Sequence, residues 1–351
     1  MSTSKQYDFT VLLGRFQPFH SGHQQIIQKA LEISERIIVL TGSSHRPPEL
    51  RNPWSHEERK NMILGSFPEE MRKKIIVMPL IDSPYNDDQW IFNIQTIVKG
   101  VTQSYIVRPH IKLKIALIGH DKDESTYYLK KFPQWDFVDI GITEDNINAT
   151  EIRNVYFSNS IYQVKPELLN FRLPEGTVAF LKNAYPAEKY TKIYSENLFI
   201  QDYKKPYENL KYEPTFNTAD ACVICCGHVL LVKRAAQPGM GLLALPGGYI
   251  EPNERVVDAM IRELKEETKI KVPSAVLRGS IKKQDFFDYP YRSSRGRIFT
   301  YCYLVELPDN ELPKTKASSD ASDIVWVPIA DINPEEMFED HYSIIMTLLG
   351  I

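Results

Sequence analysis

Residues 248–270 read GYIEPNERVVDAMIRELKEETKI, and this stretch decides the fold of the second half of the chain. A turn containing glycine and proline leads into a strong helical pattern over residues 256–268. Glu263, Glu266 and Glu267 are spaced three and four residues apart, so a helix presents their carboxylates on one face. The stretch therefore predicts an acidic helix within a domain whose other elements, from residue 216 onward, are mostly strands.

The acidic helix predicts a metal site. Clustered carboxylates repel one another unless a cation lies among them. Hard oxygen ligands suit Mg²⁺, with Mn²⁺ as the alternative. A solvated acidic helix face would explain an isolated pattern of this kind, but the preceding glycine-rich segment LPGG at residues 245–248 argues against it. We expect Glu254 and Arg262 to orient the three carboxylates.

The whole stretch resembles the Nudix box, which is Gly, five residues, Glu, seven residues, Arg-Glu, an aliphatic residue, any residue, Glu-Glu, any residue, Gly and a final aliphatic residue. Every position matches except the late glycine, which is Lys269 and should make the helix-ending turn costlier. The resemblance implies an α/β/α sandwich with a mixed sheet and a pyrophosphohydrolase that uses metal-activated water. It also implies metal binding by Gly248 and by the three glutamates, with Glu266 and Glu267 catalytic.

Residues 285–300, DFFDYPYRSSRGRIFT, alternate arginines with aromatic residues. This pattern resembles Nudix members that act on ADP-ribose, and Arg292, Arg295 and Arg297 are candidates to bind its diphosphate. An ordinary basic hairpin is the alternative. A non-catalytic ADP-ribose sensor, or a hydrolase of another nucleoside diphosphate derivative, remains a competing interpretation of the domain. The intact glutamates argue against the sensor.

The first 150 residues alternate short apolar runs with helical patterns. We expect buried strands at residues 9–13, 36–41, 75–80 and 114–119, and helices at residues 24–34, 56–64, 88–100 and 122–131. This alternation predicts parallel βαβ units and a doubly wound, Rossmann-like sheet. Ligands of such sheets bind at the carboxyl ends of the strands.

The first predicted strand leads into GRFQPFHSGH at residues 14–23. Gly14 allows a sharp turn, and Arg15 is a planar cation suited to phosphate. His20 and His23 stand where a helix should begin, beside the free N–H groups that make a helix N-terminus an anion site. A turn that merely contains two histidines is the alternative.

The ten-residue run resembles the signature of archaeal-type nicotinamide mononucleotide adenylyltransferases of the nucleotidyltransferase superfamily, a resemblance that covers about residues 8–185. It implies transfer of AMP from ATP to nicotinamide mononucleotide, giving NAD and pyrophosphate, with His20, His23 and Arg153 catalytic. The implied ATP-binding residues are Gly14, Arg15, Phe16, His20, His23, Gly119, Asp121, Thr150 and Arg153. Another adenylyl- or cytidylyltransferase is the nearest rival, and Trp90 with the extended GRFQPF run argues against it.

Three further segments carry the same resemblance: NATEIR at 148–153, GHDKD at 119–123 and DSPYNDDQW at 82–90. In the first, Thr150 could cap a helix, Arg153 could meet the ATP phosphates, and Asn148 replaces the family's serine. The implied residues for binding nicotinamide mononucleotide are Arg46, Arg59, Asp82, Asn86 and Trp90. The two arginines could instead be solvated, and Trp90 could instead belong to the core.

The bulk composition fits a two-domain enzyme. A length of 351 residues predicts two domains, which we place at residues 1–185 and 216–351, joined by an ordered linker at 186–215. The net charge of −3 gives no sign of nucleic-acid binding. The expected partners are small molecules, namely ATP, nicotinamide mononucleotide and ADP-ribose, and a homo-oligomer is compatible with the sequence.

The N-terminal segment MSTSKQYDFT lacks the apolar core of a signal peptide. The longest apolar stretch, residues 221–232, is too short to span a bilayer. We therefore expect a cytoplasmic protein without membrane contact. The cysteines of ACVICC at residues 221–226 could suggest zinc, but no second pair follows, so we expect buried thiols in a strand.

Overall fold

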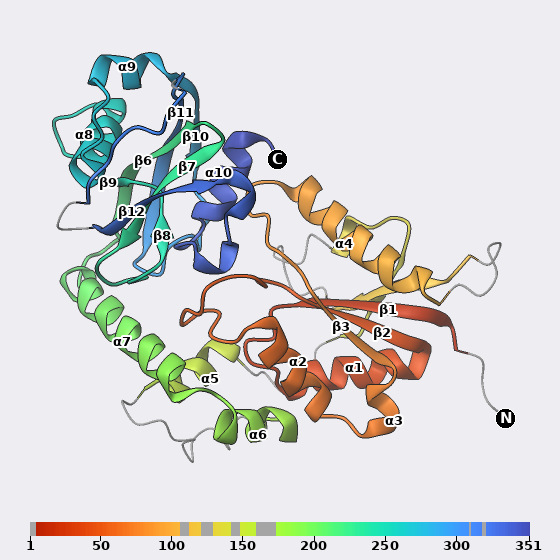
Figure 1. Cartoon of the computed structure of the whole chain (residues 1–351). Coiled ribbons are helices and arrows are strands. Elements are labelled where there is room, and N and C mark those ends of the chain that lie inside the picture. The colour runs from red at the N-terminus through yellow and green to blue at the C-terminus, as the bar shows by residue number, and fades with distance from the viewer. Residues whose placement is uncertain are drawn as a thin grey trace. The chain divides into compact units, whose positions relative to one another are not determined.

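The computed structural model describes residues 5–105, 112–120, 129–141, 148–158, 173–308, 310–317 and 321–351. The chain forms two compact units, whose elements are labelled in Figure 1. The first comprises Met1–Ser83 and Asp87–Tyr194, and the second comprises Pro84–Asn86 and Ser195–Ile351. Each unit has a sheet and hydrophobic clusters of its own.

Parallel strands form the sheet of the first unit in the order β3-β2-β1-β4-β5. They are β1 (Tyr7–Gly14), β2 (Ser34–Thr41), β3 (Ile75–Pro79), β4 (Ile115–Gly119) and β5 (Asp136–Asp139). The four predicted strands are confirmed, whereas β5 is short and largely exposed and has no apolar pattern to predict it. The strand order reverses between β1 and β4, which is where open α/β sheets bind ligands.

Helices cover both faces of this sheet. They are α1 (Ser21–Ile33), α2 (His56–Gly65), α3 (Glu69–Arg72), α4 (Asp87–Gln103), α5 (Ala149–Tyr156) and α6 (Glu175–Asn183). In β2, Ile37 and Val39 pack in the cluster that contains α1 and α2, whereas Ile38 and Leu40 pack in the cluster that contains α4. Alternate strand residues point to opposite faces, and Figure 1 shows α1 and α4 on opposite sides of the strands. The predicted doubly wound fold is confirmed, while most of the helix predicted at 122–131 lies outside the described residues.

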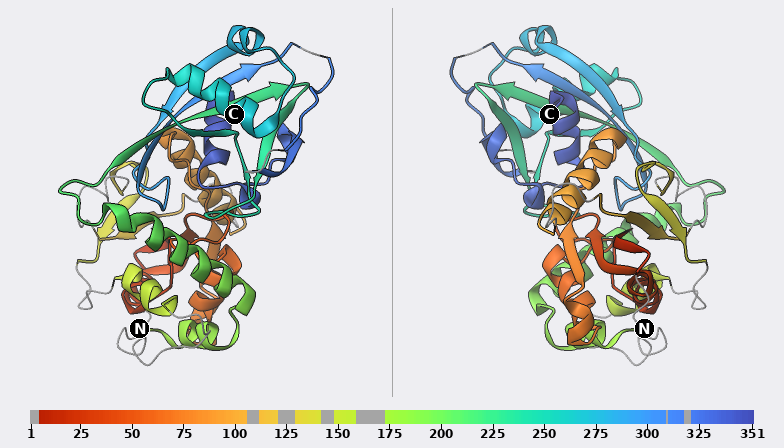
Figure 2. Two further views of the ribbon diagram at one scale, coloured as in Figure 1. Left: turned by 90° about the vertical axis from the view of Figure 1, so that its left-hand side faces the viewer. Right: turned by 90° about the vertical axis from the view of Figure 1, so that its right-hand side faces the viewer.

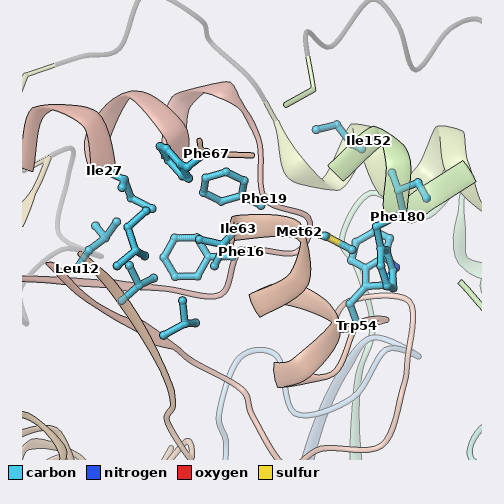
Figure 3. Close-up of a cluster of buried hydrophobic side chains, with 14 of the residues drawn as sticks. Leu12, Phe16, Phe19, Ile27, Trp54, Met62, Ile63, Phe67, Ile152 and Phe180 are labelled. Atoms are coloured by element: carbon cyan, nitrogen blue, oxygen red, sulfur yellow. The ribbon is translucent and has the colours of Figure 1, made fainter. Parts of the chain in front are cut away.

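The segment after β1 is anchored in the core on the α1 side. Phe16 and Phe19 are almost fully buried, and Figure 3 shows both rings in one cluster with Leu12 and Ile63. Burying an aromatic side chain of this size stabilises a fold by about 1.5–3 kcal/mol. The two phenylalanines of GRFQPFH therefore fix the backbone on which Arg15 and His20 are carried.

Most of the segment predicted as a linker is helical. It forms α7 (Ala187–Lys204), followed by the short 3₁₀ helix η3 (Lys205–Tyr207). Tyr190 and Ile193 are buried in the core of the first unit, whereas Tyr203 belongs to the second. Because the two ends of α7 serve different units, it has no single apolar stripe, which explains why its sequence shows no helical period.

A mixed sheet forms the second unit, with the path β10-β11-β6-β7-β12 and with β8 on β7 and β9 on β6. Its strands are β6 (Thr215–Cys225), β7 (His228–Arg234), β8 (Leu243–Ala244), β9 (Gly247–Tyr249), β10 (Ile281–Phe287), β11 (Arg297–Glu306) and β12 (Ala321–Pro328). β11 and β6 run parallel along ten residue pairs, and the other pairs are antiparallel.

Helices lie on both faces of this sheet, as the two side views in Figure 2 show. The helices are α8 (Val256–Thr268), α9 (Ser274–Gly279) and α10 (His341–Leu349), with short 3₁₀ turns η4 (Ile329–Asp331) and η5 (Pro334–Glu336). In β6, Ala221 and Val223 pack in the cluster that contains α8, whereas Cys222 packs in the cluster that contains α10. The predicted α/β/α sandwich and the predicted bounds of α8 are confirmed.

The cysteine-rich run forms a β-hairpin rather than the single strand that we expected. Cys226 and Gly227 form its turn, at φ 49° and 71°, a left-handed conformation that residues at hairpin turns adopt. Cys222 and Cys225 are buried thiols, as predicted, whereas Cys226, which we also expected to be buried, is exposed. Cys302, in β11, is buried as well. No helix in the described part of the chain is both long and apolar enough to cross a membrane.

Candidate active sites

The first candidate site lies at the carboxyl end of β1. A side chain at Gly14 would approach the Phe16 ring to 2.8 Å, so glycine lets the chain fold back over this ring. Phe16 itself has φ 52°, an uncommon conformation for a bulky residue. The carbonyl of Gly14 accepts a hydrogen bond from the N–H of Gly42, which follows β2. This hydrogen bond thus joins the carboxyl ends of β1 and β2.

His20 and His23 lie side by side at the N-terminus of α1. The helix begins at Ser21, immediately after His20, as the sequence predicts. The two imidazole rings stack with centroids 3.6 Å apart, and His23 Nδ1 accepts a hydrogen bond from the His20 N–H at 3.4 Å. The rings of Phe16 and Phe19 pack against His23, at 4.8 and 5.9 Å. Both imidazoles are therefore held beside the positive end of a helix dipole.

Arg153 joins this site from α5. Its guanidinium donates to the Gln17 carbonyl at 2.6 Å and to Thr150 Oγ1 at 3.0 Å. Burial, reinforced by the charges of Arg15 and Arg51, lowers the pKa of Arg153 to about 10. Arginines crowd together in this way where an anion can offset their repulsion. Arg51 is a member of this cationic set that local sequence patterns do not reveal.

Asn148, rather than the predicted Thr150, caps α5. The Asn148 side chain accepts from the Thr150 N–H at 2.9 Å, as N-cap residues do. Thr150 lies one position inside the helix, where its hydroxyl accepts from Arg153. The asparagine that replaces the family's serine therefore supplies the cap, and Thr150 orients the arginine.

Arg59 and Arg46 have different surroundings. Arg59 is fully buried and donates to the carbonyls of Arg15, Gly42 and Ser55 and to the Ser44 hydroxyl. These hydrogen bonds hold the loop after β1 and the loop after β2 against each other. Arg46 is partly exposed and lies 3.8 Å from Asp82, whose carboxylate also accepts from the Ser43 N–H. Their binding of nicotinamide mononucleotide stays a prediction.

The remaining predicted residues of this site are spread over several elements. Trp90 lies on α4, partly buried against the cluster on that face, with its ring 6.5 Å from that of Phe132. Gly119 ends β4 at the carboxyl edge of the sheet. Asn86 groups with the second unit. Asp121 lies outside the described residues.

In the second unit, the glycines before α8 lie against its carboxylates. A side chain on Gly248 would meet the Glu263 carboxylate at 2.5 Å, and one on Gly247 would collide with the Asp220 carboxylate. The N–H of Gly247 donates to Glu267 at 3.1 Å. The absence of side chains at both positions leaves the space that Glu263 and Asp220 occupy.

Arg262 organises the acidic set, as the sequence predicts. It holds Glu254 through two hydrogen bonds, at 2.6 and 3.1 Å. It also donates to Glu263 at 2.8 Å and to Glu266 at 3.2 Å. The Tyr249 carbonyl accepts a further bond at 3.1 Å. Arg262 therefore joins the turn of the box to the helix.

The three glutamates suit a divalent cation chemically. No three Asp, Glu, His or Cys side chains form a ready-made metal cluster in the described ranges, where Arg262 pairs with Glu263 and Glu266. Burial raises the pKa of Glu263. Burial, reinforced by the charge of Glu263, raises the pKa of Glu267 to about 7. Carboxylates whose ionised forms are disfavoured in this way gain most from a bound cation.

The arginines predicted to bind the diphosphate are engaged with the protein. Arg292 and Asp340 form a bidentate ion pair at 3.0 Å, and both side chains are 3% exposed. Arg295 lies 3.5 Å from Glu339. Arg297 donates to the Asp288 carbonyl and packs over the Phe299 ring. Substrate binding by the three arginines stays a prediction.

Arg234, at the end of β7, is a further candidate that local sequence patterns do not single out. Burial and the charge of Arg295 lower its pKa, and it interacts electrostatically with Glu267. Arg234 and Arg295 both lie over the ring of Phe338, at 4.0 and 5.8 Å. Arg234, which interacts with Glu267 of the acidic helix, and the neighbouring Arg295 form a suitable place for an anionic group of a substrate.

Comparisons with known proteins identify both halves. Residues 11–155 match the family model described as cytidylyltransferase-like, and residues 215–348 match that of the NUDIX domain. A nicotinamide/nicotinic acid mononucleotide adenylyltransferase of Acinetobacter baylyi is 37% identical over 188 residues, covering 54% of this chain and 92% of the relative. An ADP-ribose pyrophosphatase of Methanocaldococcus jannaschii is 31% identical over 161 residues, covering 44% of this chain and 89% of the relative.

A crystal structure of a Francisella tularensis protein matches nearly the whole chain. It is a bifunctional NMN adenylyltransferase/ADP ribose pyrophosphatase of Francisella tularensis, complexed with AMP and a manganese ion. It is 33% identical, covers 98% of this chain and 99% of its own, and superposes with a TM-score of 0.87. The chain therefore belongs to the family of bifunctional nicotinamide mononucleotide adenylyltransferases/ADP-ribose pyrophosphatases, with a cytidylyltransferase-like domain followed by a NUDIX domain.

Proposed function

We propose that the first unit transfers AMP from ATP to nicotinamide mononucleotide, giving NAD and pyrophosphate. The observation that carries this proposal is the convergence of His20, His23 and Arg153 at the N-terminus of α1, beside the point where the strand order reverses. The A. baylyi relative is named for this activity. We assign Gly14, Arg15, Phe16, Gly119 and Thr150 to the ATP-binding part of this proposed site.

The reaction is an in-line displacement. A phosphate oxygen of nicotinamide mononucleotide forms a bond to the α-phosphorus of ATP, and the bond from that phosphorus to the pyrophosphate oxygen breaks. Arg153 and the α1 N-terminus stabilise the negative charge that builds on the transferred group, and the two imidazoles donate hydrogen bonds to it. No side chain forms a covalent bond, so positioning supplies most of the remaining acceleration.

The test is direct. The full chain, incubated with ATP, nicotinamide mononucleotide and Mg²⁺, should release NAD and pyrophosphate in equal amounts. A parallel reaction with cytidine triphosphate in place of ATP distinguishes this activity from that of a cytidylyltransferase, the nearest rival. Absence of NAD, or formation of a cytidylyl product alone, would overturn the proposal.

We propose that the second unit hydrolyses ADP-ribose to AMP and ribose 5-phosphate. The observation that carries this proposal is the acidic set formed by Glu263, Glu266 and Glu267 and held by Arg262 against Gly247 and Gly248. These carboxylates, with the backbone of Gly248, are the proposed ligands of Mg²⁺ or Mn²⁺. When bound, the cation polarises the diphosphate and acidifies a water molecule.

The protein's own groups then position the substrate. Arg234 and Arg295 lie where they can neutralise the diphosphate, and Glu267, held by the Gly247 N–H, is fixed close to the place of reaction. Incubation of the full chain with ADP-ribose and Mg²⁺ should release AMP. Tight binding of ADP-ribose without any AMP, at every concentration of Mg²⁺ or Mn²⁺, would establish the sensor interpretation instead.

A further inference from the structure

Two neighbouring thiols meet at the turn of the β6–β7 hairpin. Cys225 is the last residue of β6, and Cys226 lies in the turn at φ 49°. Their sulfur atoms are 3.7 Å apart. Cys225 is only 1% exposed, whereas Cys226 is exposed. A solvent-accessible thiol is therefore in contact with a second thiol that is buried, and we call these two residues the thiol pair.

Hydrogen bonds on both sides hold the turn that carries the thiol pair. Cys225 is paired with His228 across the hairpin. The ring of His228 donates from Nδ1 to the Cys226 carbonyl at 2.8 Å. The Gly227 carbonyl accepts a hydrogen bond from the N–H of Ile329 at 3.0 Å. The backbone is thus fixed in a conformation that keeps the two sulfur atoms within reach of each other.

The other two cysteines of the chain have no such access to solvent. Cys222 in β6 and Cys302 in β11 are both 0% exposed. Burial raises the pKa of Cys222 to about 12, and burial also raises the pKa of Cys302. The thiolate is the nucleophilic form of cysteine, so buried thiols of this kind are inert. Reactivity should therefore begin at Cys226.

The thiol pair is separate from the proposed hydrolytic site. In β6, Ala219 and Asp220 pair with the two glycines of β9. Cys225 follows Asp220 by five residues in the same strand, which corresponds to about 17 Å at the usual rise of a strand. The hairpin turn contains none of the proposed metal ligands. A reaction at the thiol pair therefore does not depend on hydrolysis of ADP-ribose.

We propose that the thiol pair is a reversible modification site for low-molecular-weight disulfides, with glutathione disulfide as the probe. Exposure makes Cys226 the thiol that reacts first, and the sulfur–sulfur contact makes Cys225 the thiol that resolves the adduct. An accessible cysteine next to a resolving cysteine is the arrangement found in redox-sensitive proteins. Because Cys225 is buried, the order of the two steps is fixed.

The reaction consists of two thiol–disulfide exchanges. After losing its proton, the Cys226 sulfur attacks one sulfur of glutathione disulfide, which forms a mixed disulfide and releases one glutathione. The Cys225 sulfur then loses its proton and attacks the Cys226 sulfur, which breaks the bond to the second glutathione and releases it. Both leaving thiolates take up a proton. The two protein thiols are thus oxidised to a disulfide, and one glutathione disulfide is reduced to two glutathione molecules.

The product should be easily reduced. Consecutive Cα atoms are about 3.8 Å apart, whereas the Cα atoms of disulfide-bonded residues are usually about 4.4–6.8 Å apart. A disulfide between neighbouring residues is therefore strained, and strained disulfides are the labile ones. The thiol pair thus suits a modification that other thiols reverse.

Mass spectrometry of the wild-type full chain gives the first test. After incubation with excess glutathione disulfide and digestion without reductant, we expect a Cys225–Cys226 bond, loss of two hydrogen atoms and no retained glutathione. Fragment masses distinguish this bond from one that involves Cys222 or Cys302. Excess reduced glutathione should then restore both thiols. Thiols that remain unchanged, a stable glutathione adduct at Cys226, or a bond to Cys222 or Cys302 would each overturn the proposal.

Variants separate the two steps. Cys225→Ser removes the resolving sulfur, and its hydroxyl can donate to the Glu311 carbonyl, which lies 3.6 Å from the Cys225 sulfur. Retained glutathione should rise from almost none in the wild type to about one molecule per chain. Cys226→Ser removes the attacking sulfur and should retain none. Cys302→Ala is the matched control, because it removes a buried thiol and leaves the pair intact, so it should react like the wild type.

Thermal unfolding shows whether each variant is folded, and the measurement on the wild type needs no variant. Equal amounts of retained glutathione in the wild type and Cys225→Ser would overturn the resolving role of Cys225. A Cys226→Ser variant that reacts with glutathione disulfide as fast as the wild type would overturn the attacking role of Cys226.

Discussion

The two candidate sites are expected to act on the same kind of chemical group, a phosphoanhydride. The protein side chains that characterise the two sites carry opposite charges. In the first, Arg15 and Arg51 interact electrostatically with Arg153, which donates to the loop that precedes α1. In the second, the proposed metal-binding side chains of α8 are carboxylates, which pair with Arg262. Protein cations can contact phosphate directly, whereas carboxylates can do so only through a metal ion. The comparison teaches that the second site should depend on its metal for the chemical step, with Arg234 and Arg295 sharing in the binding of the diphosphate, whereas the first should retain protein-borne charge stabilisation.

The largest effect should follow removal of a carboxylate from the acidic helix. Glu267→Gln keeps the size of the side chain and can still accept from the Gly247 N–H, but it removes one charge. Because a metal ion supplies several kcal/mol to such reactions, AMP release from ADP-ribose should fall about 10³-fold. The dependence on Mg²⁺ should shift to higher concentrations, while NAD synthesis stays at the wild-type rate.

Glu251→Gln is the matched control for this variant, because Glu251 lies exposed in the turn before α8 and takes part there through its backbone N–H. It should hydrolyse ADP-ribose like the wild type. Full activity of Glu267→Gln would remove Glu267 from the metal ligands and would weaken the contrast between the two sites.

The next effect concerns the cationic site. His23→Ala removes a ring packed between Phe16, Phe19 and His20 at the start of α1. Loss of a hydrogen-bond donor to a developing charge costs about 10²–10³ in kcat. NAD formation should fall by this factor, with smaller changes in KM for ATP and nicotinamide mononucleotide, and ADP-ribose hydrolysis should be unchanged. A normal kcat would show that the histidine only forms the turn.

Acid should affect the stability of the second unit through His341. This residue is buried at the start of α10, where its Nδ1 accepts from the Leu245 N–H. Burial lowers the pKa of His341 from 6.5 to about 3. Between these values the unfolded chain binds the proton and the folded chain does not, so stability is lost as the pH falls below 6.5. At about pH 5.5, this one group should cost about 1.4 kcal/mol.

His341→Asn tests this source of acid sensitivity, because the amide oxygen can still accept from Leu245 but does not titrate. Thermal unfolding at about pH 7.5 and about pH 5.5 should show a smaller difference in Tm for the variant than for the wild type. An equal difference in both proteins would assign the acid sensitivity to other groups.

The sequence predicts those features that depend on residues close together along the chain. The bounds of α8 and the common face of its glutamates depend on residues within four positions of one another, and both are found as expected. The proximity of Arg51 to Arg153 and of Arg234 to Glu267 depends on how distant segments pack. No local spacing encodes such contacts. The sequence of helix α7 shows no helical period for a related reason. Its two ends belong to two different units, so no single apolar face runs along the helix.

The smallest expected effect concerns the end of the acidic helix. Lys269 follows α8 in a left-handed conformation, at φ 47°, where the Nudix pattern has glycine. A residue with a side chain pays a steric cost in this conformation that glycine avoids. The Lys269 N–H donates to the Lys265 carbonyl at 3.0 Å, a backbone contact that glycine retains. Relief of this cost, about 1–2 kcal/mol, outweighs the greater freedom of glycine in the unfolded chain. Lys269→Gly should therefore stabilise the second unit by a net amount of about 1 kcal/mol.

For a unit of this size, such a gain raises Tm by about 2–4 °C. Lys271→Gly is the control, because this exposed lysine beyond the helix has no left-handed backbone to relieve, and it should not stabilise the unit. ADP-ribose hydrolysis should be unchanged in both variants, because Lys269 carries none of the proposed metal ligands. A lower Tm for Lys269→Gly would mean that lysine at this position contributes more through its side chain than its backbone conformation costs. A change in hydrolysis would instead show that the helix end controls the position of Glu266 and Glu267, and the second site would then depend on backbone geometry as closely as the first.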